Sequence, residues 1–185
     1  GGLNANILRV AGEYLQQQKG NVSVLAMGKK GRDFIARIGT TLRAVFTDIG
    51  DQPTLSDITP VARLAMEAYR NEDVDAVHIA FADFVNTTLQ RPIVRRLLPV
   101  VPAELDARDS VGYIYEPTAL EVLDRLIPRY VEMQIFHALL ENIASEQSAR
   151  MVAMRTATDN ANEMKDDLTL VMNKACLLYT SPSPR

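Results

Sequence analysis

Residues 118–175 decide the fold, and they read TALEVLDRLIPRYVEMQIFHALLENIASEQSARMVAMRTATDNANEMKDDLTLVMNKA. The stretch contains one proline, Pro128, no glycine, and mostly strong helix formers such as Glu, Ala, Leu, Met, Arg and Gln. Thr118 followed by Glu121 is the capping-box pattern that begins a helix. A helix over the whole stretch would be about 87 Å long at roughly 1.5 Å per residue, well beyond the usual globular helix. The sequence therefore predicts a coiled coil, a rod or a spacer.

Apolar and small residues of this stretch form one narrow stripe. A stripe of this width suits a single partner helix, and the small residues between Ala144 and Ala161 would let that partner approach closely. The competing interpretation, an amphipathic helix lying on its own domain, is the commoner case. A helix this long, however, must extend beyond any domain that the chain can build. The stripe recurs at steps of three and four residues and comprises Val131, Ile135, Leu139, Ile143, Met151, Met154, Thr158, Ala161, Leu168 and Met172.

Composition places the chain among globular proteins. It has 185 residues, 47% of them hydrophobic and 23% charged, and a formal net charge of −3, which does not favour general nucleic-acid binding. Its single cysteine, Cys176, excludes an internal disulfide framework and a cysteine-rich metal site. We predict no membrane-spanning segment and no secretory signal. The absence of an initiator methionine suggests that the natural start lies upstream.

The residues before the long stretch alternate between strand and helix patterns. This alternation predicts an α/β domain with a mostly parallel sheet and flanking helices over residues 1–116, followed by a coiled-coil-type helix over 117–175 and a tail over 176–185. Pro92 lies within one predicted strand and predicts a sheet edge or a bulge there. Helices are expected over 4–18, around 33–37 and from a cap at Ser56 or Thr59 to Asn71, and strands over 22–27, 42–49, 75–85, 88–100 and 111–115.

Residues that could carry chemistry are scattered. His78 falls in a predicted strand and His137 in the long helix, and isolated histidines are more often packing or surface residues than ligands. Asp166 and Asp167 are adjacent, but neighbouring helical residues diverge by about 100°, so they cannot act on one atom. A solvated helix face is the simpler interpretation of that pair.

Two basic clusters also have simpler interpretations than a phosphate site. The run Gly28-Lys29-Lys30-Gly31 lacks the GxxxxGK spacing of a phosphate loop, and we expect a solvated turn. Arg91, Arg95 and Arg96 are expected to be surface charge or a subunit contact. We therefore predict no catalytic, cofactor-binding or metal-binding residues, and a role in an assembly rather than as an enzyme.

Three segments together resemble one known family. Residues 145–155 read SEQSARMVAMR and are followed from Ala157 by ATDNA, residues 168–175 read LTLVMNKA, and residues 1–4 read GGLN. The first closely resembles the segment before the C-terminal region of the gamma subunit of F-type ATP synthases, and the second also fits that family. The third is similar to the end of that family's Gly-Leu-Cys-Gly-Gly-Leu-Asn motif. The resemblance covers residues 1–175 in order.

The resemblance implies an architecture and a function. The family's gamma subunit has an α/β sheet domain and a long antiparallel coiled coil made by its N- and C-terminal helices. As the central-stalk rotor it turns inside a ring of alpha and beta subunits, meets the epsilon subunit and the membrane rotor ring, and couples proton flow to ATP synthesis. The resemblance thus implies a non-catalytic subunit with no cofactor and no nucleic-acid partner. It also implies a peripheral membrane protein on the cytoplasmic face of the bacterial inner membrane, or on the matrix face if mitochondrial.

The same resemblance implies where the chain meets other subunits. Arg150 corresponds to a family arginine of the coupling region, where it would contact the beta subunits or the N-terminal helix. The alternative is a solvated arginine on a helix face. The candidate subunit-interface or coupling residues are Glu146, Arg150, Met151, Met154, Arg155 and Asp159.

The sequence departs from the family at two ends and within the stripe. The N-terminal helix that would complete the coiled coil is missing, so we expect a fragment whose stripe lacks its partner. Residues 176–185 replace the native C-terminal end with CLLYTSPSPR, and we expect a foreign, disordered tail because its prolines end any helix. Lys165 places a charge where an apolar residue would continue the stripe.

Two other hypotheses remain open from the residues alone. An α/β nucleotide-binding or signalling module with a helical tail would require a phosphate loop or an acidic site at the strand ends, and neither motif is visible. A freestanding coiled-coil scaffold is disfavoured by the globular pattern of residues 1–116.

Overall fold

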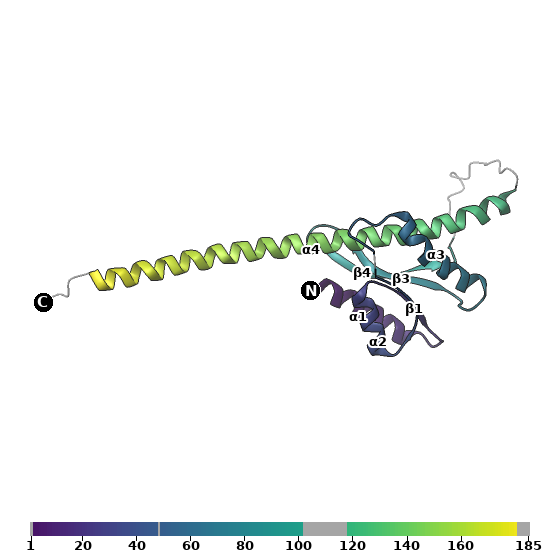
Figure 1. Cartoon of the computed structure of the whole chain (residues 1–185), viewed down its shortest axis with the longest axis horizontal. Coiled ribbons are helices and arrows are strands. Elements are labelled where there is room, and N and C mark those ends of the chain that lie inside the picture. The colour runs from purple at the N-terminus through teal and green to yellow at the C-terminus, as the bar shows by residue number, and fades with distance from the viewer. Residues whose placement is uncertain (1, 48, 102–117, 181–185) are drawn as a thin grey trace.

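The computed structural model describes residues 2–47, 49–101 and 118–180, as a small α/β body from which one long helix projects (Figure 1). The predicted order, an α/β region with flanking helices followed by a long C-terminal helix, is confirmed. The strand predicted at residues 111–115 lies outside the described residues. The elements are α1 (Gly2–Gln17), β1 (Ser23–Met27), α2 (Lys29–Ile38), β2 (Thr41–Phe46), α3 (Leu55–Arg70), β3 (Val77–Phe84), β4 (Gln90–Leu98) and α4 (Ala119–Thr180).

The strands in the described residues form two separate pairs. β1 and β2 are parallel and connected through α2, as the α/β pattern predicts. β3 and β4 are antiparallel, so the expectation of mostly parallel pairing holds only for the first pair. The connection between β3 and β4 spans only residues 85–89, whereas a parallel pair needs a crossover of a dozen or more residues. As Pro92 predicted, β4 is an edge strand within the described residues, bonded along one side to β3.

Two helix starts differ from the sequence prediction. α2 begins at Lys29, directly after Gly28, which turns the chain with a φ of 94° that favours glycine. The run that we expected to be a turn is therefore mostly the first turn of a helix. α3 is capped by Thr54 and not by Ser56 or Thr59, because the Asp57 carboxylate reaches back to accept the Thr54 backbone N–H at 2.8 Å. This hydrogen bond, with a second from the Thr54 hydroxyl, lowers the pKa of Asp57.

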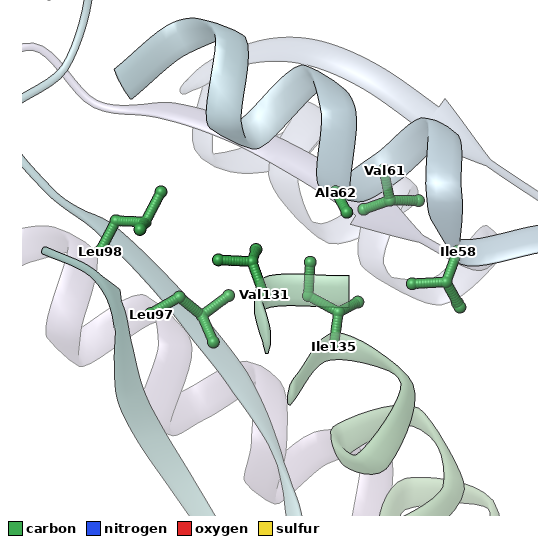
Figure 2. Packing of buried hydrophobic residues seen from close by; sticks show 7 residues of the cluster. All are labelled: Ile58, Val61, Ala62, Leu97, Leu98, Val131 and Ile135. Atoms are coloured by element: carbon green, nitrogen blue, oxygen red, sulfur yellow. The ribbon is translucent and has the colours of Figure 1, made fainter. Parts of the chain in front are cut away.

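The core of the body lies between α3, β4 and the first half of α4 (Figure 2). Val131 of α4 is fully buried, and Leu25, Met27 and Phe46 from the parallel pair pack against the same cluster. The core of the body therefore includes residues of α4 as well as residues of the α/β elements before it. The seven central residues of this cluster are Ile58, Val61, Ala62, Leu97, Leu98, Val131 and Ile135.

A close contact joins α1 to α2 at Gly12, the buried residue of α1. A Cβ atom at this position would lie 3.1 Å from the Phe34 Cζ atom. At Gly31 of α2, by contrast, the nearest atom would be the Ala26 Cβ at 3.8 Å, an ordinary contact. Both glycines are helical, so they form a matched pair in which only Gly12 is required by packing.

We expect Gly31→Ala to stabilise the chain by up to about 1 kcal/mol, the gain in helix propensity. The same change at Gly12 should give no net stabilisation, because the close contact with Phe34 offsets the gain in helix propensity. Gly12→Val should destabilise by about 1–3 kcal/mol, because overpacking adds to the clash. Urea denaturation followed by circular dichroism measures all three variants. Equal stabilisation by Gly12→Ala and Gly31→Ala would show that the contact with Phe34 imposes no constraint.

Candidate functional site

The second half of α4 stands free of the body. Ser148 is the last buried residue of the helix, and every residue from 151 to 180 is exposed. These residues extend the helix by about 45 Å at roughly 1.5 Å per residue. Figure 1 shows this overhang as the yellow-green end of α4, pointing away from all other elements.

The overhang is longer than the sequence predicted. Our expectation that disorder begins at Cys176 is wrong for residues 176–180, which continue the helix to Thr180. Cysteine, leucine and tyrosine tolerate helical geometry, and the first proline after them is Pro182. The remainder of the tail lies outside the described residues. That residues 176–185 are foreign to the native protein stays a prediction.

The apolar stripe of α4 divides into two faces. Val131 and Ile135 pack into the body, so the prediction that the whole stripe serves one partner helix is wrong for its first half. Met154, Leu168 and Met172 are 66%, 63% and 63% exposed. At about 100° per residue, these three point about 120° away from the buried face. The commoner interpretation, a helix lying on its own domain, thus applies to the first half, and an unpartnered face begins in the second.

We call the exposed apolar face of the overhang the distal seam; it is formed by Met154, Ala161, Leu168 and Met172. Its side chains line one shallow groove along the helix, and Met154 continues the same face toward the body. Lys165 lies in this groove, where its long aliphatic stem can cover apolar surface while the ammonium group stays in water. The groove is lined by Ala161, Met164, Lys165, Leu168, Thr169 and Met172.

The six candidate interface residues do not share one face. From helical geometry, Arg150 and Met154 point within about 25° of the distal seam, and Glu146 and Met151 flank it at about 70°. Arg155 and Asp159 point more than about 110° away from it. The structure thus brings four of the six candidates to or beside the seam and separates the other two.

Arg150 is held by Glu146 one helical turn earlier. Its guanidinium lies 2.7 Å from the Glu146 carboxylate, and both side chains are about half exposed. An exposed pair at this spacing contributes only about 0.3–0.5 kcal/mol to stability. The pair therefore orients the arginine beside the seam without being a major source of stability.

Sequence reasoning missed a set of polar contacts at the base of the overhang. The Ser148 hydroxyl donates to the Thr87 carbonyl at 2.8 Å, and the Ser145 hydroxyl donates to the Ala82 carbonyl at 3.3 Å. Asn142 Oδ1 accepts the Ala82 N–H at 3.4 Å. The available signal was the three-residue spacing of these polar residues, which continues the buried face. We had instead assigned the small residues of this region to close approach of a partner helix.

Three other residues singled out in the sequence contact neighbours within the body. The His78 ring lies 5.1 Å from the Tyr14 ring, and burial, with a smaller effect from Arg96, lowers its pKa and favours the neutral form. Arg95 lies over the Phe81 ring at 5.1 Å, and Arg91 pairs with Asp83 at 2.9 Å. Across the described ranges, His, Cys, Asp and Glu side chains form no group of three suited to a metal ion. No helix there has an apolar stretch long enough to cross a bilayer.

Comparison with known sequences decides the family. A family model described as ATP synthase matches residues 1–176. A chain from Dehalococcoides mccartyi named ATP synthase gamma chain is 51% identical over 175 residues, which are 95% of this chain and 61% of the relative. The chain belongs to the ATP synthase gamma-chain family. A gamma chain of Herpetosiphon aurantiacus is 48% identical, over 95% of this chain and 62% of its own length. The chain thus spans about three fifths of these gamma chains.

Solved structures show the same fold. The central stalk and c-ring structure of the Tetrahymena thermophila mitochondrial ATP synthase contains a chain with a TM-score of 0.64 at 22% identity, over 85% of this chain and 70% of that one. The rotor of the Euglena gracilis mitochondrial ATP synthase contains one with a TM-score of 0.61 at 18% identity, over 98% and 70%. None of these gamma-chain or central-stalk matches supports the hypothesis of a nucleotide-binding or signalling module.

Proposed function

We propose that this chain acts as a central-stalk rotor subunit of an F-type ATP synthase, coupling proton flow through the membrane sector to ATP synthesis in the alpha and beta ring. The observation that carries the proposal is the exposed overhang of α4 on a chain of the gamma family. An overhang of about 45 Å costs backbone entropy and gains no burial within the body. In this proposal, a second helix that is not among the described residues stabilises the overhang by covering its apolar face.

The narrow apolar face of the distal seam supports a helix as that partner. In this proposal α4 is one half of an antiparallel coiled coil, and the second half lies against Met154, Leu168 and Met172. The small side chain of Ala161 in the same face allows close approach of the two helices. Helices pair by inserting side chains of one into spaces between four side chains of the other, which suits a narrow apolar seam.

The remaining partners follow from the rotor role. The coiled coil would contact the alpha and beta subunits, and the far end of the body would meet the epsilon subunit and the membrane rotor ring. The subunit itself would use no cofactor and catalyse no reaction, because its task is to present different faces to the catalytic subunits as it turns. It would then be a peripheral membrane protein on the cytoplasmic face of the bacterial inner membrane, or on the matrix face if mitochondrial.

Arg150→Ala in a complete gamma chain assembled with its partners tests this role. We expect less proton pumping per ATP hydrolysed, because Arg150 would contact the beta subunits or the partner helix from its place beside the seam. A hydrogen bond of a charged group is worth about 1.5–3 kcal/mol, roughly tenfold or more in a binding equilibrium. Pumping and hydrolysis are measured together in membrane vesicles.

Arg63→Ala is the control, since it removes the same group from the exposed surface of α3, a position to which the proposal assigns no subunit contact. Its coupling should stay close to that of the unmodified complex. Unaltered pumping and synthesis in Arg150→Ala, or equal losses in both variants, would count against the assigned coupling role.

A further inference from the structure

Three side chains of α4 bond to the backbone of the β3–β4 hairpin. We call Asn142, Ser145 and Ser148, with their partners Ala82 and Thr87, the polar clasp. Asn142 Oδ1 accepts the Ala82 N–H, and the Ser145 hydroxyl donates to the Ala82 carbonyl. The backbone N–H and C=O groups of Ala82 are thereby both bonded to α4, by side chains that lie three residues apart.

The sheet explains why Ala82 is available for these bonds. Ala82 lies opposite Pro92 of β4, and a proline is tolerated in an edge strand where its ring nitrogen points away from the partner strand. In an antiparallel pair, alternate residues turn their N–H and C=O groups away from the partner strand. Ala82 therefore directs both groups to the open edge of β3, where α4 lies in place of another strand.

The second contact of the clasp is with a fixed loop. Ser148 donates to the Thr87 carbonyl at 2.8 Å, and Asn86 Oδ1 holds that loop by accepting the backbone N–H groups of Thr88 at 3.0 Å and Leu89 at 2.7 Å. Ser145 is 0% exposed and Ser148 is 8% exposed, so water competes little for either hydroxyl. Both hydroxyls are thus tied to backbone atoms that do not move freely.

The position of the clasp gives it mechanical importance. It is the last attachment of α4, and about 48 Å of helix extends from Ser148 to Thr180 at roughly 1.5 Å per residue. A tilt of about 5° at the clasp would move the far end of a lever of that length by roughly 4 Å. The core below the clasp contacts α4 through Val131 and Ile135, and such apolar contacts are non-directional. Hydrogen bonds depend on angle and therefore limit rotation.

We propose that Asn142, Ser145 and Ser148 are positioning residues that fix the rotational angle and tilt at which α4 leaves the body. By doing so they determine the direction in which the distal seam and Arg150 face. The significance of this angle rests on the proposed rotor function, in which a twist applied to the body must reach the overhang without slipping. The angle itself is a property of this chain and can be measured without any other subunit.

Spin-label distances measure the angle directly. In a complete gamma chain, where a second helix covers the distal seam and the native cysteines are changed to serine, single cysteines replace Glu67, exposed on α3, and Glu163, exposed on the overhang about 22 Å beyond Ser148. Pulsed electron-spin resonance then gives the distribution of distances between labels at these positions. We expect Ser145→Ala combined with Ser148→Ala to broaden or shift this distribution while the circular dichroism of the body is retained. Thr156→Ala should leave it unchanged, because that hydroxyl bonds only to the Val152 carbonyl of α4 itself.

Amide exchange tests the Asn142 contact separately. Asn142→Ala should speed exchange at the Ala82 amide about fivefold, which corresponds to the net contribution of one hydrogen bond. The Phe81 amide, directed toward β4, is the internal control and should change little. The distance measurement overturns the proposal if the double variant keeps the unmodified distribution, or if Thr156→Ala changes it equally. If the double variant does not fold, Ser148→Ala alone decides by the same criteria. If the unmodified chain shows the expected distance distribution but does not couple in the assembled enzyme, that result contradicts the rotor role and leaves the positioning role standing.

Discussion

Replacing Ile135 with alanine is expected to lower the free energy of unfolding by about 2–5 kcal/mol, the range for truncating a buried aliphatic side chain. Ile135 is 2% exposed and joins α4 to α3 and β4 in the core cluster. Alanine is the better helix former, so helix propensity would oppose the loss and cannot cause it. The destabilisation would therefore measure packing of α4 into the body. Urea denaturation followed by circular dichroism gives the difference.

Met172→Ala is the control for this experiment. Met172 lies on the same helix but in the exposed overhang, and surface substitutions away from special features usually change stability by less than about 0.5 kcal/mol. A similar small change for Ile135→Ala would mean that the body folds without α4. A large change for Met172→Ala would mean that the overhang is buried, for instance against a second molecule.

The second large effect is a contrast in amide hydrogen exchange along α4. In the monomeric chain, we expect amides of residues 131–148 to be protected at least about a thousandfold more than those of residues 151–180. Amides of residues 131–148 exchange only when the body unfolds, which costs about 5 kcal/mol or more. Residues 151–180 form a lone helix, and lone helices are marginal in water because most helical stability comes from packing. Exchange measured by mass spectrometry or NMR resolves the two groups.

Concentration separates fraying from association in this experiment. An exposed apolar face can bury itself against another copy, which would add protection around Met154, Leu168 and Met172 as the concentration rises. Protection that depends on concentration would identify a contact between copies. Strong protection of residues 151–175 in a demonstrated monomer would refute the expectation that the overhang is frayed when alone.

The sequence predicted elements that depend on local chemistry. Thr118 does bond the Glu121 N–H at the start of α4, and the helix runs through its one proline for its full length. The antiparallel pairing of β3 and β4 follows from the five-residue connection, which is too short for a parallel crossover, whereas the α/β alternation indicates parallel pairing. Thr54 with Asp57 three residues later is also a local capping pattern, but Ser56 and Thr59 offer equally suitable caps, so residue type alone did not distinguish the three.

The candidate site could be predicted only as a segment. The resemblance located Glu146, Arg150 and their neighbours as one segment. Residues one or five positions apart on a helix point in different directions, so Arg155 and Asp159 do not lie on the seam. The division of the stripe into two faces could not be read from spacing, because it depends on which part of α4 the body covers. The polar clasp could not be predicted from the sequence, because it depends on Ala82 lying opposite Pro92. No local sequence pattern contains that relation between two strands.

The overhang also determines how this chain behaves in bulk solution. A compact chain of 185 residues would have a radius of gyration of about 16 Å, whereas the 62 residues of α4 alone span roughly 93 Å. Gel filtration separates molecules by hydrodynamic size and not by mass, so friction along such a rod makes one 20.5 kDa molecule elute like a heavier compact particle. Light scattering or sedimentation equilibrium, which report mass, distinguishes this extended monomer from a true dimer.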